Sequence, residues 1–431
     1  MELKRNIGFW GASFLVLNGL IGAGIFALPA KMANTLGAAS PWIFLLFGAL
    51  MLSIVWCFGQ LALKLQDTGG PTVYSEAAFG RFASFQTGWL YYLARATAIA
   101  ANMHVLLLYA SYLWPELQSA TGQSLAILVI SALLVWVNIT GVKTAIRALD
   151  GITLLKLLPF VVLLSVGIVN LPDTADAVTL PALDTIGAGA LLTLYAFIGF
   201  ETVVVTSGET RKPGKTIPRA LILTVIAIAL FYFVVQYVYW HTIGAGESDS
   251  APLIVLADVL FGQTGAIVMT LTAVFSVAGN LLANSISTSR LTFAMAKEKT
   301  LPHIFGHVHP RYATPDISII VLGVFAAIMA LSGGFVWLAI ASVLARLLVY
   351  ALCIVALMKL QRQHQWLHNK GRFKKAMAWG VPVLAIATCI WSVAQSDASA
   401  WWFLVGECAV GGLLYLALRK SSHFQSGNGN A

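Results

Sequence analysis

Two glycine-containing interruptions give the clearest chemical signal in this sequence. They are Ile21-Gly22-Ala23-Gly24-Ile25 and Phe197-Ile198-Gly199-Phe200-Glu201, each in the middle of a hydrophobic stretch. Glycine permits backbone dihedrals that a helix does not use, and it allows a ligand to approach the backbone closely. N–H groups at the start of a helix bind anions, and the carbonyls of an unwound segment accept hydrogen bonds. The two interruptions therefore predict a binding site built from backbone groups.

The elements that carry these interruptions are membrane spans. The chain is 59% hydrophobic and 10% charged, whereas soluble domains are about a quarter charged. Apolar runs of roughly 20 residues, each long enough to cross a bilayer, predict about twelve spans. We place them near 8–33, 40–64, 82–113, 124–141, 150–170, 184–208, 216–242, 264–296, 315–332, 335–359, 376–394 and 400–419.

The interrupted spans are the first and the sixth. Irregular backbone at membrane depth is tolerated only beside protein or a water-filled cavity. Paired interruptions in corresponding spans are typical of secondary transporters built from inverted repeats. Five spans per repeat, an odd number, would invert the second repeat. We therefore predict repeats at about 8–170 and 184–359 within a core of 1–375, two peripheral or dimer-forming spans in 376–420, and a disordered cytoplasmic tail at 421–431.

The net charge of +9 comes from basic residues that lie in loops on one side of the predicted spans. This distribution argues against nucleic-acid binding. Loops on one side carry the basic residues, namely Lys4, Arg5, Lys64, Arg81, Lys143, Arg147, Arg211, Lys212, Lys215, Arg219, Lys297, Lys299, Arg311, several in 359–375, Arg419 and Lys420. The opposite loops carry Glu116, Asp173, Asp176, Glu247, Asp249 and Asp397 without Lys or Arg, and Lys31 is the one exception. The positive-inside rule then places both termini in the cytoplasm.

Residues for other chemistry are scattered. Cys57, Cys353, Cys389 and Cys408 are far apart, and His104 and His241 have no companions at metal-ligand spacing. We expect no metal, no cofactor and no enzymatic activity, because clustered ligands or a nucleophile with its base would be needed. The sequence also has no nucleotide-binding P-loop.

Four ordered motifs make a family resemblance specific. They are GLIGAGIFALPA, DTGGPTVYSEAAFGRFASFQTGWLYYLARATA, FIGFETVVVTSGETRKPGKTIPRAL and SRLTFAMAKEKTLPHIFGHVHPRYATP. Together they resemble transporters of the amino acid–polyamine–organocation superfamily, among them bacterial amino acid permeases. The resemblance implies an all-α, LeuT-like membrane protein with a ten-helix core and discontinuous helices 1 and 6. It also implies amino acid substrates.

An amino acid brings a carboxylate and an ammonium. The carboxylate would bind N–H groups of the first break, and the ammonium would bind carbonyls near Ile21 and in the second break. The expected substrate site comprises Ile21, Gly22, Ala23, Gly24, Ile25, Asn102, Tyr195, Ala196, Phe197, Ile198 and Gly199. Two alternatives stay open: the glycines could serve only close helix packing, and Tyr195 could be either an aromatic gate or a packing residue.

A lysine within the fifth span is a candidate for coupling. A charge at the centre of a span is costly and usually faces a cavity or a partner. The resemblance implies that the ammonium of Lys156 occupies the place of sodium, between the first span near Gly19 and Asn284 or Ser285. Lys156 could carry protons, act as a fixed tether, or extend from the cytoplasmic end of its span. Glu201 could likewise carry protons, or hold unwound backbone or a basic residue.

A buried cationic side chain would need a nearby carboxylate, and Glu201 is the one deep acid near the expected pocket. We therefore favour neutral L-amino acids over cationic amino acids or polyamines. The expected activity is sodium-independent exchange or proton-coupled symport in the cytoplasmic (inner) membrane, with lipid around a monomer or homodimer. A non-transporting amino acid sensor is the alternative from another class.

Overall fold

The computed structural model describes residues 5, 7–141, 157–171, 181–246, 251–364, 366 and 371–420. Within these ranges the regular secondary structure is helical, apart from one isolated parallel bridge between Ile7 and Thr210. Eight of the described helices are long and apolar enough to cross a membrane, and shorter apolar helices accompany them.

The α-helices are α1 (Phe9–Leu20), α2 (Gly24–Leu36), α3 (Ser40–Lys64), α4 (Pro71–Phe79), α5 (Arg81–Ala110), α6 (Ala120–Thr140), α8 (Leu157–Val169), α9 (Leu183–Ala196), α10 (Thr202–Val205), α11 (Pro213–Ile243), α12 (Pro252–Lys297), α13 (Asp316–Ser332), α14 (Phe335–Gln363), α15 (Arg372–Ala394) and α16 (Ala398–Lys420). Short 3₁₀ turns are η1 (Gly37–Ala39), η2 (Pro115–Gln118), η3 (Ser207–Glu209) and η4 (His303–Gly306). All twelve predicted spans correspond to helices, although 150–156 of the fifth span lies outside the described residues.

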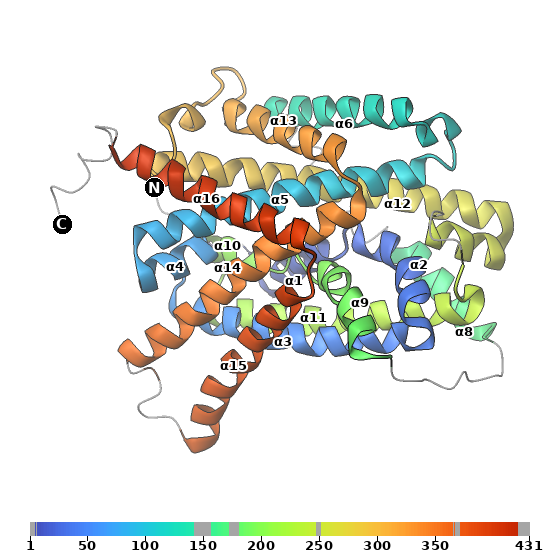
Figure 1. Cartoon of the computed structure of the whole chain (residues 1–431), viewed down its shortest axis with the longest axis horizontal. Helices are drawn as coiled ribbons and strands as arrows, with labels where there is room; N and C mark the ends of the chain where they lie inside the picture. Colours follow the sequence, from blue (N-terminus) through green and yellow to red (C-terminus); the bar gives the residue numbers. More distant parts are fainter. Residues whose placement is uncertain are drawn as a thin grey trace.

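The first and sixth spans are discontinuous, as predicted. α1 ends at Leu20 and α2 begins at Gly24, while α9 ends at Ala196 and α10 begins at Thr202. α1 contacts α10, and α2 contacts α9. The first half of one broken span therefore lies beside the second half of the other, so the two spans run antiparallel at the centre of the molecule (Figure 1).

The two breaks meet backbone to backbone. A Cβ added to Gly19 would lie 2.4 Å from the carbonyl oxygen of Gly199. A Cβ added to Gly199 would lie 2.3 Å from the carbonyl oxygen of Gly19. Gly199 also has a φ of +119°, which side chains rarely adopt. Only glycine at both positions permits this approach.

Two helical segments were not predicted. α4 is a short helix that begins at Pro71, and Gly70 and Gly80 flank it with positive φ. Proline suits the first turn of a helix because its missing N–H has no partner there. The other segment is the start of α12, which precedes a kink at Gly262 (φ 64°, ψ −162°).

Helices around the broken pair form a packed core with an apolar exterior. α3, α5, α11, α12 and α14 share the main interhelical contacts, whereas α6 and α13 pack together at one side (Figure 1). α6 exposes a row of large apolar side chains, namely Leu125, Leu128, Val129, Leu133 and Trp136. Such an exterior suits a lipid environment.

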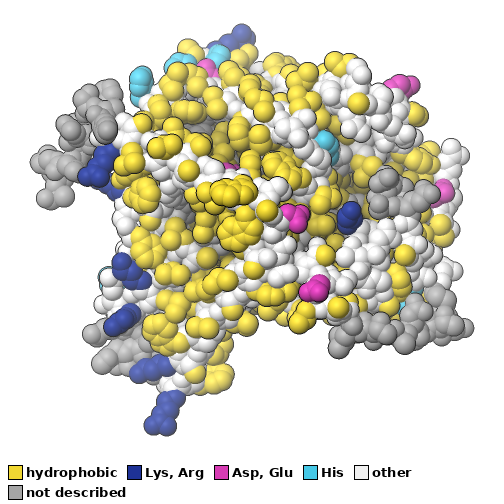
Figure 2. All heavy atoms as spheres, viewed as in Figure 1, with side chains coloured by type: hydrophobic (Ala, Val, Ile, Leu, Met, Phe, Trp, Pro, Cys, Tyr) yellow, Lys and Arg dark blue, Asp and Glu magenta, His cyan; other side chains and the backbone are white. Residues whose placement is uncertain are grey.

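Charges are segregated along the molecule. Most of the visible Lys and Arg side chains lie toward the left end in Figure 2, and most of the Asp and Glu side chains lie elsewhere. The described starts of α5, α11 and α15 and the end of α12 carry basic residues. We call this the basic end.

Candidate functional site

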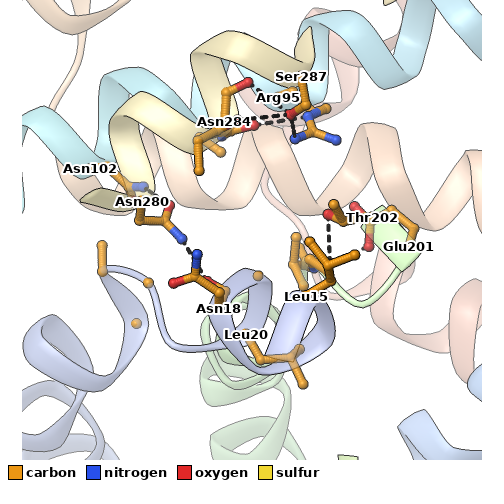
Figure 3. Close-up of a pocket in the computed structure, with 18 of the residues that line it drawn as sticks. Leu15, Asn18, Leu20, Arg95, Asn102, Glu201, Thr202, Asn280, Asn284 and Ser287 are labelled. Carbon is orange, nitrogen blue, oxygen red and sulfur yellow. Dashed lines mark hydrogen bonds between the residues drawn. The ribbon is translucent and has the colours of Figure 1, made fainter. Parts of the chain in front are cut away.

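A cavity of about 310 Å³ lies at the two breaks. Its lining comes from both broken spans and from α5, α12 and α14 (Figure 3). The lining residues are Leu15, Asn18, Gly19, Leu20, Gly22, Ala23, Gly24, Arg95, Ala98, Asn102, Tyr195, Ile198, Gly199, Glu201, Thr202, Thr206, Asn280, Ala283, Asn284, Ile286, Ser287 and Arg346.

The start of α2 presents backbone donors to this cavity. No side chain caps the helix. The N–H groups of Ala23, Gly24 and Ile25 have no hydrogen-bond acceptor among the described residues, and Ala23 and Gly24 line the cavity. Uncapped N–H groups at a helix start form an anion site, which the helix dipole strengthens.

The sixth span presents backbone acceptors. The N–H of Phe197 bonds to Leu194 and that of Ile198 to Tyr195, so the end of α9 is closed by tight turns. The carbonyls of Ala196, Phe197 and Ile198 receive no hydrogen bond from the described part of the chain. Ile198 and Gly199 line the cavity. Buried carbonyls of this kind need a donor, which an ammonium group supplies.

A chain of side-chain hydrogen bonds joins four helices at the cavity. Tyr195 Oη donates to Asn102 Oδ1 (3.1 Å), and Asn102 Nδ2 donates to Asn280 Oδ1 (2.8 Å). Asn280 Nδ2 donates to the carbonyl of Asn18 (3.0 Å). These residues belong to α9, α5, α12 and α1, so the chain fixes the positions of both broken spans against the core (Figure 3).

Glu201, the last residue of the second break, forms a buried ion pair. Arg346 Nε donates to Glu201 Oε1 (3.0 Å), and Glu201 Oε2 accepts from the Tyr350 hydroxyl and the Gly199 N–H (3.0 Å each). Glu201 is 1% exposed and Arg346 is 3% exposed. Arg346 Nη1 also donates to the carbonyl of Ala94 (2.8 Å). Glu201 thus makes both contacts named for its structural role, one to unwound backbone and one to a basic residue.

Arg95 lies on α5, on the side of the cavity shown at the top of Figure 3. Its Nε donates to Asn284 Oδ1 (2.8 Å) and Thr288 Oγ1 (2.9 Å). Nη1 donates to Tyr91 Oη (2.8 Å), and Nη2 donates to Ser287 Oγ. The guanidinium is therefore held among neutral oxygen atoms.

The structure gathers most of the predicted site residues around one cavity. Gly22, Ala23, Gly24, Asn102, Tyr195, Ile198, Gly199, Glu201 and Asn284 line it. Ile21, Ile25, Ala196 and Phe197 are buried beside these residues but are not in its lining. Ser285 is also outside the lining, and its hydroxyl accepts from Asn138 Nδ2 of α6 (2.6 Å). Lys156 lies outside the described residues.

Sequence reasoning missed several lining residues. Asn280 is central to the hydrogen-bond chain, and Asn18 and Thr202 also line the cavity. A polar residue within an apolar span was the available signal, since such residues usually face a bundle interior. Arg346 of α14 was also missed, and it is buried against Glu201.

Comparisons with known proteins agree with this architecture. The model of the amino acid permease family matches residues 7–427. The chain is 28% identical over 397 residues to the serine/threonine exchanger SteT of Bacillus subtilis, with 89% of each chain covered. It is 25% identical over 443 residues to the methylthioribose transporter of B. subtilis (98% and 95% covered). It is 24% identical over 411 residues to the D-serine/D-alanine/glycine transporter of Escherichia coli K12 (88% and 86% covered).

A solved structure gives the fold independently. The crystal structure of MhsT in complex with L-phenylalanine aligns with a TM-score of 0.62 at 15% identity, covering 92% of this chain and all of that one. The fold is LeuT-like, as expected. The matched relatives are named as transporters and exchangers rather than enzymes. This multi-pass membrane protein therefore belongs to the amino acid permease family of the amino acid–polyamine–organocation superfamily.

Proposed function

We propose that the chain is a secondary transporter that carries an amino acid across the cytoplasmic membrane by alternating access. One observation carries the proposal. Ala23 and Gly24, whose N–H groups have no acceptor among the described residues, and Ile198, whose carbonyl has no donor there, line the same cavity. An α-carboxylate and an α-ammonium on one carbon complement these two groups of backbone atoms.

The orientation follows from the basic end, which we place in the cytoplasm by the positive-inside rule. Gly24, Asn102, Tyr195 and Asn280 line the cavity at the breaks, and four segments continue the lining toward the basic end. It reaches Leu15 on α1, Arg95 on α5, Thr206 after α10 and Ser287 on α12. The cavity thus extends toward the cytoplasm, with both termini on that side.

The cavity disfavours a cationic substrate. Arg95 and Arg346 both line it, and the carboxylate of Glu201 is already bonded to Arg346, Tyr350 and Gly199. A lysine, arginine or polyamine group would meet like charge. Neutral and acidic amino acids remain, and the sequence favoured neutral L-amino acids. One relative is named for methylthioribose, so the α-amino acid itself needs testing.

We assign the coupling of transport to ions or protons to Lys156. Its ammonium would replace sodium and either carry protons or remain a fixed tether.

The proposed function is tested by flux into proteoliposomes with a panel of labelled amino acids, with and without internal amino acid and with an imposed proton gradient. A requirement for internal amino acid would identify an exchanger. Accumulation in empty vesicles driven by protons would identify a symporter, and sodium should have no effect. Absence of flux across the panel would contradict the proposal and favour a sensor or another substrate.

Lys156→Ala should reduce transport severely or change its pH dependence while the protein stays folded. The reason is that the partners proposed for its ammonium would lose a donor, and a buried acceptor without a donor is costly. Flux is measured from pH 5 to 8, with Lys64→Ala, an exposed lysine at the end of α3, as the control. If the Lys156→Ala protein kept the wild-type flux rate and pH profile, Lys156 would have no role in coupling.

α15 and α16 are proposed as peripheral helices outside the two repeats. α15 packs on α3 and α14, and α16 packs on α5 and α14. Trp402 of α16 is 75% exposed. This surface would face lipid in a monomer or a second copy in a homodimer.

A further inference from the structure

Arg95 brings a charge to the cavity that the described part of the chain does not balance. Its side chain is buried, with 7% exposure. Its hydrogen-bond acceptors are the side-chain oxygens of Asn284, Thr288, Tyr91 and Ser287, all of them neutral. Among the described residues the ion pairs are His307–Asp316 and Arg346–Glu201, and neither includes Arg95.

The guanidinium also retains hydrogen-bonding capacity. It has five N–H groups, one on Nε and two on each terminal nitrogen. The hydrogen bonds within the described residues use the Nε group and one on each terminal nitrogen. One N–H on Nη1 and one on Nη2 are therefore left without an acceptor there. Donors on both terminal nitrogens can bind the two oxygens of a carboxylate.

Arg346 provides the contrast within the same cavity. Its charge is paired with Glu201 at 3.0 Å. Two guanidinium groups and one carboxylate among the described lining residues leave one net positive charge. A buried charge without a partner is costly, so an anion bound at Arg95 would offset this cost.

From its position, Arg95 can bind the side chain of a substrate rather than its α-carboxylate or α-ammonium. The α-carboxylate is assigned to the N–H groups at the start of α2, near Asn102. Arg95 lies on the same face of α5, two turns or about 10 Å nearer the basic end. A substrate held at the breaks can direct its side chain along the cavity toward the long side chain of Arg95.

We infer that the substrate is an acidic amino acid, whose side-chain carboxylate binds Arg95. The inference rests on the proposed function and narrows its substrate class. It replaces the sequence-based preference for a neutral side chain. The contact with Asn284, Thr288, Tyr91 and Ser287 holds the guanidinium in place for this carboxylate.

The experiment compares matched acid and amide pairs. Uptake of labelled glutamate, glutamine, aspartate and asparagine is measured in proteoliposomes containing the full-length protein, in chloride and in gluconate. The wild type should favour the acid of each pair at least tenfold in kcat/KM. Arg95→Gln should erase or reverse this preference, and Arg95→Lys should retain part of it. Arg290→Gln, which removes an exposed arginine from α12, should retain all of it.

Three outcomes would overturn the inference alone. The wild type could take up the amides at least as well as the acids, which would leave amino acid transport itself supported. A folded Arg95→Gln protein could keep the preference for acids, with folding checked by its thermal unfolding midpoint. Neutral amino acid uptake could depend on chloride in the wild type but not in Arg95→Gln, which would make the bound anion inorganic. Absence of flux for every amino acid of the wider panel, with and without internal amino acid, would overturn the proposed function together with the inference.

Discussion

The two halves of the broken-helix pair differ in what surrounds them. By the orientation proposed above we call α2 with α9 the outer half, and aromatic residues pack there. Tyr109 Oη donates to the carbonyl of Phe26 (2.8 Å) and accepts from the Leu253 N–H (3.2 Å), and the Tyr195 and Phe335 rings meet edge to face at 5.7 Å. We call α1 with α10 the inner half. It supplies more of the cavity lining, with Leu15, Asn18, Gly19, Leu20 and Thr202, than the outer half, which supplies Gly24 and Tyr195.

Under the proposed orientation, this difference places the charged part of the cavity on the cytoplasmic side of the breaks. In the outer half the rings of Phe26, Tyr109 and Tyr195 are buried, and aromatic packing stabilises beyond the buried area alone. The charged groups beside the inner half include Arg95 of α5 and Arg346 of α14. Hydrogen bonds from Arg95 to α12 and from Arg346 to α5 hold them at the cavity. Alternating access would then require the two halves to exchange these properties.

The largest effect on transport should come from altering the contact between Gly19 and Gly199, where the two halves meet. Gly199→Val places a branched side chain against Gly19 at a residue with φ +119°. We expect complete loss of transport and a lower thermal unfolding midpoint. Gly380→Val is the matched control, because a Cβ at Gly380 would have no atom within 4 Å. Normal transport by the Gly199 variant would show that the junction can widen without cost.

The next largest effect should fall on the inner half. Glu201→Gln leaves Arg346 charged and buried without its partner, and breaking such a pair costs about 3–5 kcal/mol. The thermal unfolding midpoint of the purified protein should fall accordingly. Glu116→Gln, at an exposed turn, should leave the midpoint unchanged. Equal midpoints for both variants would mean that the ion pair does not stabilise the inner half.

The smallest effect should fall on the outer half. Tyr195→Phe removes the hydrogen bond to Asn102 but keeps the ring against Phe335. Loss of one neutral hydrogen bond costs about 0.5–1.5 kcal/mol, so the apparent substrate affinity should fall about two- to tenfold. Tyr112→Phe, at an exposed tyrosine, is the control. A loss of apparent affinity of more than a hundredfold would mean that the hydroxyl of Tyr195, rather than its ring, makes the main contribution.

The sequence predicted the spans and both breaks because these depend on local composition. Apolar length sets a span, and glycine marks where a helix can open. α4 and the start of α12 escaped prediction because they are short segments bounded by glycine and proline. Their position depends on the surrounding helices rather than on an apolar run.

The lining of the cavity was only partly predictable. Backbone donors at Ala23 and Gly24 follow from the break itself. The pairing of Asn102 with Asn280 joins residues 178 positions apart, and no local pattern indicates it. The same holds for Arg346 and Glu201, which come from α14 and the second break. Lys156 remains a prediction, since it lies outside the described residues.

The contact between Gly19 and Gly199 has an evolutionary consequence. Any substitution at either position adds at least a Cβ, which would lie 2.4 Å or less from a carbonyl oxygen of the other residue. A second substitution across the contact adds further atoms and relieves nothing. A substitution at one of these glycines therefore cannot be rescued by a substitution at the other. In a library randomised at both positions and selected for transport, glycine should be recovered at both, without covariation between them.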